Sequence, residues 1–170
     1  CTDPNALNYN SEAKKNNNSC EYQDFDKLSL LINLADNYII PSLNSYKEKI
    51  VDLDNQVDEF NLNTNENNLT ILRNKWEDAL LNWQDVAFLD FGPSEYILLR
   101  SQTNTFPIDT NELNNSINTG TWNLQYSTFN DSKGLQAFDY LLFKPNFSNN
   151  DLINYFQSDS NTKNYLKSVS

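Results

Sequence analysis

Apolar side chains recur at steps of three and four residues between positions 25 and 60, and this periodicity constrains the fold more than any other feature. Such spacing places the apolar side chains on one face, which predicts a long amphipathic helix. Because proline lacks a backbone N–H and clashes with the preceding turn, we predict a kink or break between Asn37 and Pro41. The stripe comprises Ile32, Ala35, Ile39, Leu43, Tyr46, Ile50, Leu53, Val57 and Phe60.

A second apolar stripe follows a polar, turn-like stretch at residues 61–68. We predict that Asn63 or Thr64 caps this helix and that Glu66 completes a capping box. The helix ends by Gly92-Pro93, which is a strong stop signal. A short polar link between two helices favours antiparallel packing. The second stripe comprises Leu69, Leu72, Trp76, Ala79, Leu80, Trp83 and Ala87.

The rest of the chain predicts shorter helices. Residues 91–131 are rich in Asn, Ser and Thr and interrupted by Pro and Gly, so only a short helix around residues 112–118 is predicted there. Ser132 and Ser148 are candidate N-caps of two further helices. The last helix starts near Ser160.

Together these elements predict an all-α fold, an antiparallel helical bundle at residues 25–170 preceded by an irregular arm at residues 1–24. No C-cap follows Val169, and the two long helices offer more apolar surface than the short ones cover. We therefore expect that the chain is one half of a longer protein, or that a partner segment completes the bundle.

The composition excludes several classes of function. The formal net charge is −11, and phosphate binding needs clustered Lys and Arg, so nucleic acid is not an expected partner. No apolar run approaches the ~20 residues that span a bilayer. The chain has no His, which rules out a His-Glu-x-x-His zinc site and any Ser-His-Asp or Cys-His arrangement within it.

The segment Lys133-Gly134-Leu135-Gln136-Ala137-Phe138-Asp139-Tyr140-Leu141-Leu142-Phe143 resembles the signature of the imelysin family, named after an insulin-cleaving bacterial peptidase. That signature reads Gly-x-His-x-x-Glu before an aromatic and a Leu-Leu-Phe run. The tryptophans of the second stripe and Phe91-Gly92-Pro93 are similar to the family's Trp-rich helix and the turn after it. The resemblance covers residues 26–170 and implies the N-terminal half of an exported, helical protein associated with iron or haem uptake.

The signature positions differ from the family in the two residues that matter chemically. Gln136 stands in place of the His and Asp139 in place of the Glu. Residues three apart share a helix face, so the family's pair can grip a metal ion or exchange a proton. A Gln amide is a poor zinc ligand and no general base. We favour hydrogen bonds from Gln136 and Asp139 that hold their helix against residues 91–131 over a working metal site.

Acidic residues near the irregular segment are candidates for a different site. Asp85, Asp90 and Glu95, with Asp139, form an oxygen-ligand site for calcium or iron if the fold brings them together. Arg100 follows an apolar run in the same region, and we expect it to pair with Glu95 or Asp139. A divalent cation or iron is thus the candidate cofactor, although no residue pattern requires one.

The arm contains the chain's two cysteines, Cys1 and Cys20. Its Cys-Thr-Asp-Pro start, Asn-Tyr pair and closing Ser-Cys-x-Tyr resemble a short module of exported Bacteroidetes proteins. That resemblance implies a Cys1–Cys20 disulfide, which contributes ~3 kcal/mol by restricting the unfolded chain. The alternative is that Cys1 carries the lipid of a lipoprotein. Both alternatives place the protein outside the cytoplasm, at the outer membrane, at the cell surface or in the periplasm.

Three functions are compatible with these observations. The first is a surface binding or accessory protein without peptidase activity, linked to iron or haem acquisition through an outer-membrane uptake receptor. The second is a metallopeptidase whose unusual site is completed by a missing half. The third is a structural or adhesive surface module with the arm as a spacer. We favour the first.

Overall fold

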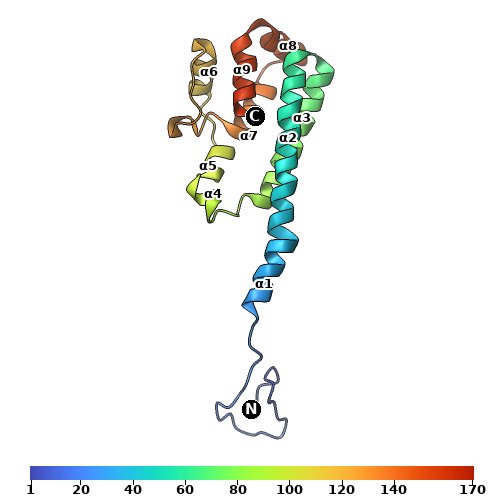
Figure 1. The fold of residues 1–170 in the computed structure, drawn as a ribbon, viewed down its shortest axis with the longest axis vertical. Coiled ribbons are helices and arrows are strands. Elements are labelled where there is room, and N and C mark those ends of the chain that lie inside the picture. Colours follow the sequence, from blue (N-terminus) through green and yellow to red (C-terminus); the bar gives the residue numbers. More distant parts are fainter. The chain divides into compact units, whose positions relative to one another are not determined.

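The computed structural model describes residues 1–170, which form helices and no strands (Figure 1). The predicted all-α class is therefore confirmed. The chain divides into two compact units, Cys1–Tyr38 and Ile39–Ser170. Each unit is described by itself below.

The first unit opens with a disulfide-closed loop. Cys1 and Cys20 are bonded as predicted. Asn8 ties the two sides of the loop together, because its Nδ2 donates to the Ser19 carbonyl at 2.6 Å and its Oδ1 accepts from the Glu21 N–H at 3.0 Å. The Tyr22 hydroxyl donates to the Asp3 carboxylate at 2.8 Å. The loop therefore has its own hydrogen-bond network.

Helix α1, Lys27–Leu34, follows the loop and is capped by Asp26, which accepts from the Ser29 N–H at 3.0 Å. A π-helical turn, η1 (Ala35–Ile39), leads to α2, Ile40–Leu62. The irregularity predicted before Pro41 is therefore a widened, π-helical turn and not a break in the helix. Pro41 cannot donate to the carbonyl one turn earlier, and a π-turn accommodates that missing bond.

Helices α2 and α3, Glu66–Val86, form the predicted antiparallel pair (Figure 1). The N-cap prediction for α3 was wrong: Asn65 is the cap and accepts from the Asn68 N–H at 2.9 Å. Asn63 instead ends α2, and the buried Thr64 hydroxyl donates to the Phe60 carbonyl at 2.9 Å. In the short link, Asn63 and Thr64 terminate α2, and only Asn65 caps α3.

The segment predicted to be irregular contains several short helices. They are α4 (Pro93–Tyr96), α5 (Leu99–Thr103), α6 (Thr110–Thr119) and a 3₁₀ turn, η2 (Ser127–Phe129). Helix α6 confirms the short helix predicted around residues 112–118. Asp109 caps it by accepting from the N–H groups of Asn111 and Glu112.

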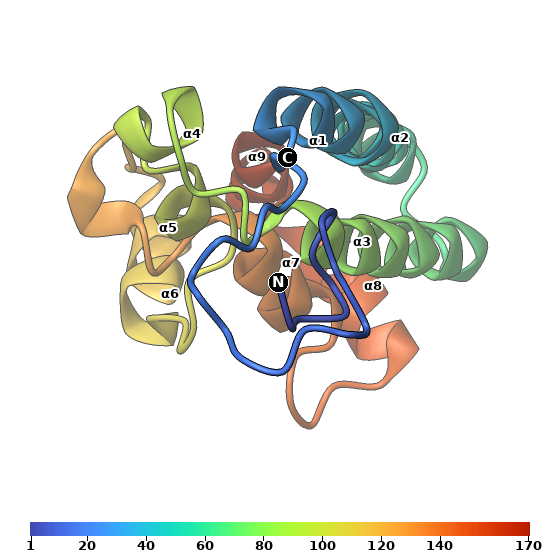
Figure 2. The same ribbon diagram turned by 90° about the horizontal axis from the view of Figure 1, so that it is seen from below.

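The last three helices are α7 (Gly134–Leu142), α8 (Asn149–Ser158) and α9 (Ser160–Val169). Ser148 caps α8 in a capping box with Asp151, as predicted for this serine. Ser132 does not cap α7, because its hydroxyl donates to the Phe129 carbonyl at 3.2 Å and closes the preceding turn. In Figure 2, α3 lies on one side of α7 and α5 on the other.

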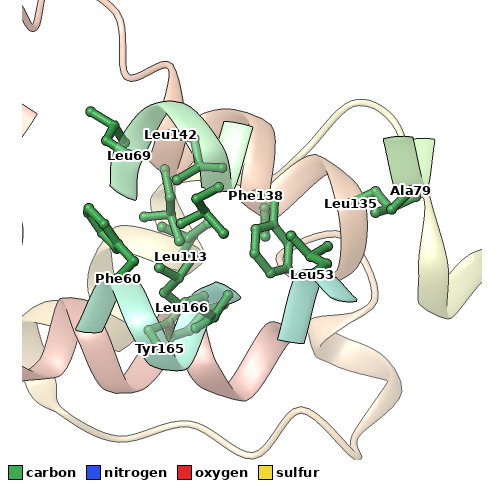
Figure 3. Packing of buried hydrophobic residues seen from close by; sticks show 14 of the residues in the cluster. Leu53, Phe60, Leu69, Ala79, Leu113, Leu135, Phe138, Leu142, Tyr165 and Leu166 are labelled. Carbon is green, nitrogen blue, oxygen red and sulfur yellow. The ribbon is translucent and has the colours of Figure 1, made fainter. Parts of the chain in front are cut away.

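The core of the second unit is formed by α2, α3, α6, α7, α8 and α9, and Figure 3 shows part of it. The apolar face of α7 is buried, with Phe138 only 1% exposed. Tyr165 of α9 is fully buried, and its hydroxyl donates to the Ser132 carbonyl at 2.7 Å. The labelled core residues are Leu53, Phe60, Leu69, Ala79, Leu113, Leu135, Phe138, Leu142, Tyr165 and Leu166. This packing positions the start of α7, where the signature lies.

Candidate binding site at the signature helix

Gly134 lets two helices meet at the start of α7. Its φ is +69°, a conformation that L side chains rarely adopt. A Cβ added at this position would lie 2.2 Å from the carbonyl oxygen of Thr103, the last residue of α5. The signature glycine therefore allows the end of α5 to approach the backbone of α7.

Gln136 is half-buried on the first turn of α7, and its Nε2 donates to Asn104 Oδ1 at 2.7 Å. This contact confirms that Gln136 holds α7 against residues 91–131. The same expectation was wrong for Asp139, whose carboxylate has no hydrogen-bond partner and is exposed. Asp139 lies almost a full turn further along α7, beyond the contact with Asn104. Surrounding protein atoms displace some water from the carboxyl and raise its pKa.

Lys133 is a buried cation next to the signature glycine, only 7% exposed. Its Nζ donates to the Leu124 carbonyl at 2.6 Å and to Gln102 Oε1 at 3.3 Å. Neither partner is charged, and burial lowers the pKa of the ammonium group. Sequence reasoning missed this residue, because lysine is rarely buried and nothing in its neighbourhood signalled an interior position.

Three of the candidate site residues named from the sequence line one pocket of about 550 Å³. They are Asp90, Glu95 and Arg100; Asp85 is not part of its lining. Asn104 also lines this pocket, so the Gln136 contact connects the signature helix to it. We call it the α4–α5 pocket, and its lining is Asp90, Glu95, Leu98, Arg100, Ser101, Asn104, Thr105 and Phe106.

The expected ion pair of Arg100 with Glu95 or Asp139 was wrong. The four ion pairs of the protein join Lys49 to Asp78, Lys75 to Asp52, and Lys167 to both Asp54 and Asp58. All of them stabilise the packing of α2 on α3 or of α9 on α2. Arg100 lines the same pocket as Asp90 and Glu95 but forms no ion pair with either.

The predicted oxygen-ligand site does not assemble. No three carboxylates or cysteines come close enough to hold one metal ion, so Asp85, Asp90, Glu95 and Asp139 do not form a calcium or iron centre. The signature positions do not fit a transition metal either. The Gln136 amide is bonded to Asn104, which leaves Asp139 as a single carboxylate, whereas metal sites combine several such ligands.

A second, more apolar pocket of about 260 Å³ lies beside Gly134, between α2, α5, α7 and α9. Tyr46, Ile50, Leu99, Phe138 and Val169 contribute its apolar walls. It carries no carboxylate and no basic side chain. Of its lining residues, Tyr46, Ile50 and Leu53 belong to the first predicted apolar stripe, and the periodicity gave no sign of a gap beside them.

The fold and the signature define an all-helical protein. Its signature helix, α7, starts at Gly134, which has a positive φ, and contacts the α4–α5 pocket through Gln136. The sequence profile described as imelysin matches residues 39–170. This match spans more than half of the chain, so the chain belongs to the imelysin family. No curated protein and no solved structure matches it.

Proposed function

We propose that the protein is an exported binding or accessory protein of the imelysin type, associated with iron or haem uptake and without peptidase activity. The observation that carries this proposal is the Gln136–Asn104 hydrogen bond. At the position where the family has an imidazole, the side chain makes a structural amide contact. The signature thus supports a pocket, and the carboxylate of Asp139 is the only ligand or base that it still offers.

Peptide hydrolysis needs an activated water, and the chain's own residues offer poor means of activating one. Gln136 has no basic lone pair near neutral pH. Asp139 keeps a carboxylate with a raised pKa, but no second ionisable partner orients it. A binding role makes no such demand, because recognition needs only shape and complementary polar groups.

Export is supported by the disulfide. Bonds such as Cys1–Cys20 persist in oxidising compartments and are rare in the cytosol. None of the helices is both long and apolar enough to cross a membrane. We place the protein at the outer membrane, at the cell surface or in the periplasm. The bonded sulfur of Cys1 favours the disulfide over a lipid anchor, because one sulfur cannot do both.

A protein partner or a further helical half is supported by the exposed apolar side chains of α1. Leu28 is 68% exposed, and Leu31 and Ile32 are more than half exposed. Exposed apolar surface of this kind is typical of a surface that another protein covers. For an accessory protein of uptake, the corresponding partner is an outer-membrane uptake receptor.

Metal and peptidase assays test the absence of hydrolysis. We expect the purified chain to retain no zinc or ferrous iron after desalting and to cleave neither insulin nor casein. The double variant Gln136→His, Asp139→Glu restores the family pair and should gain zinc affinity. Asn74→His is its matched control, because it places an imidazole three residues before the exposed Glu77 on α3. Cleavage by the unmodified chain that a chelator abolishes would refute the proposal.

A separate titration tests the link to uptake. Haemin and ferric citrate are added to the chain while absorbance and tryptophan fluorescence are followed. Saturable binding of either at one equivalent supports the uptake role. Binding of neither, together with no recovery of an uptake receptor from native envelopes, would contradict that role and favour a structural module.

A further inference from the structure

The α4–α5 pocket combines opposite charges that do not neutralise each other. Asp90 precedes α4, Glu95 lies on α4 and Arg100 lies on α5, and all three side chains line the same hollow of about 550 Å³. None of them takes part in an ion pair. All three residues are exposed, so a ligand with charges of both signs can reach their unpaired side chains from solvent.

The contrast with the other arginine sharpens this point. The chain has two arginines, and Arg73 uses its guanidinium fully, donating from Nε and Nη2 to the Leu142 carbonyl and from Nη1 to Asn149 Oδ1. Arg100 donates to no protein group. A guanidinium presents paired N–H groups that match a carboxylate. Arg100 is therefore the anion-binding group of the pocket.

Asn104 adds a second donor at the same end. Its Oδ1 accepts from Gln136, which leaves both protons of its Nδ2 without a protein acceptor. The hydroxyls of Ser101 and Thr105 already donate to the carbonyls of Leu98 and Ser101. In the pocket they can only accept, as the carboxylates of Asp90 and Glu95 do. The lining thus has donors for an anion and acceptors for a cation.

Two apolar side chains complete the pocket. Phe106 is 80% exposed and Leu98 is 56% exposed, and both belong to its lining. Leu98 adopts a left-handed backbone conformation with φ of 53°, which is strained for a residue with a branched side chain. Such strain is commonly found at functional sites. The apolar pair is the expected contact for a hydrophobic side chain of the ligand.

We propose that the α4–α5 pocket binds a free α-amino acid with an apolar side chain. Its carboxylate binds Arg100 and Asn104, its ammonium group binds Asp90 and Glu95, and its side chain contacts Leu98 and Phe106. A divalent cation is disfavoured by Arg100, and a simple anion by the two carboxylates. This inference does not depend on iron, haem or the loss of hydrolysis.

Calorimetric titration of the full chain with L-leucine tests the proposal. We expect saturable binding with a Kd of ~1 mM, a typical value for a small ligand in an open site. Leucinamide lacks the carboxylate and N-acetyl-leucine lacks the ammonium group, and each should bind roughly tenfold more weakly or worse. Leucine binding that is absent, or equal to that of both analogues, would overturn the proposal.

Variants locate the binding. Arg100→Gln should weaken leucine binding roughly tenfold and remove the preference for leucine over leucinamide. Glu95→Gln should reduce the preference for leucine over N-acetyl-leucine. Glu77→Gln on α3 is the control, because it removes an exposed carboxylate outside the pocket and should leave binding unchanged. Unaltered binding in Arg100→Gln, or tighter binding of leucyl-leucine than of leucine, would contradict the assignment.

The outcome is separable from the proposed uptake role. Leucine binding without haem or iron binding would leave the pocket assignment standing and remove the uptake role. Haem or iron binding without leucine binding would do the opposite. Displacement of leucine by calcium would show that the pocket is a cation site and would also refute the assignment.

Discussion

The two arginines mark two regions of the second unit that differ in how their polar and apolar groups are satisfied. Around Arg73, the guanidinium bonds to the end of α7 and the start of α8 and lies 4.8 Å from the centre of the Phe143 ring. Around Arg100, charges stay unpaired and aromatic side chains stay exposed. The interactions around Arg73 stabilise the fold, whereas the unpaired groups around Arg100 remain available to a ligand.

The largest expected difference between the regions is in the free energy of unfolding that is lost when a phenylalanine is replaced by alanine. Phe138→Ala leaves a cavity in the core and should lower the free energy of unfolding by about 3–5 kcal/mol. Phe106→Ala removes a side chain that is 80% exposed and should change it by less than about 0.5 kcal/mol. Urea unfolding followed by tryptophan fluorescence measures both. Similar losses would mean that residues 99–106 belong to the folding core.

Two glycines give the next contrast. Gly134→Ala strains a positive φ and drives a Cβ against the Thr103 carbonyl, whereas Gly92→Ala strains a similar φ with open space around the Cβ. The backbone overlap should cost Gly134→Ala about 1–3 kcal/mol more than Gly92→Ala. Thermal unfolding of both variants checks this value. Equal costs would show that α5 moves away freely and that its contact with α7 is weak.

The arginines themselves give a third, smaller contrast. Arg73→Met leaves the Leu142 carbonyl and the Asn149 amide without their donors and should cost about 1–3 kcal/mol. Arg100→Met loses no protein contact and should stay within about 0.5 kcal/mol. The denaturation midpoints of the two variants measure these two stability losses. A large loss in Arg100→Met would indicate that the guanidinium stabilises the fold and is not held for a ligand.

The smallest effect concerns Asp139 and pH. Because the pKa of its carboxyl is raised in the folded state, ionisation opposes folding, and stability declines as the pH rises through that pKa. Asp139→Asn should therefore stabilise the protein near neutral pH by less than about 1 kcal/mol, since solvent screens an exposed carboxylate. The gain should vanish in acid. Glu77→Gln serves as the control. A gain that persists below pH ~3 would assign it to another cause.

The accuracy of the sequence-based predictions followed how local each feature is. The helices that carry the apolar stripes and the Ser148 N-cap depend on neighbouring residues and were correct, and the irregularity before Pro41 is a π-helical turn. The α3 cap was misplaced by one or two residues, because Asn63 and Thr64 finish α2 instead. The Gln136 contact was correct in kind, but its partner Asn104 lies 32 residues away, and no spacing rule could identify it.

The amino-acid sequence alone determined that this chain is helical, that it has an imelysin-like signature and that the signature lacks its imidazole. These properties follow from periodicity, turn chemistry and side-chain type, which act within a few residues. Only the tertiary structure decided that Asp90, Glu95 and Arg100 share a pocket while Asp85 and Asp139 do not. The physical reason is that convergence depends on how α5 packs on α7 at Gly134, which the packing of the whole unit sets.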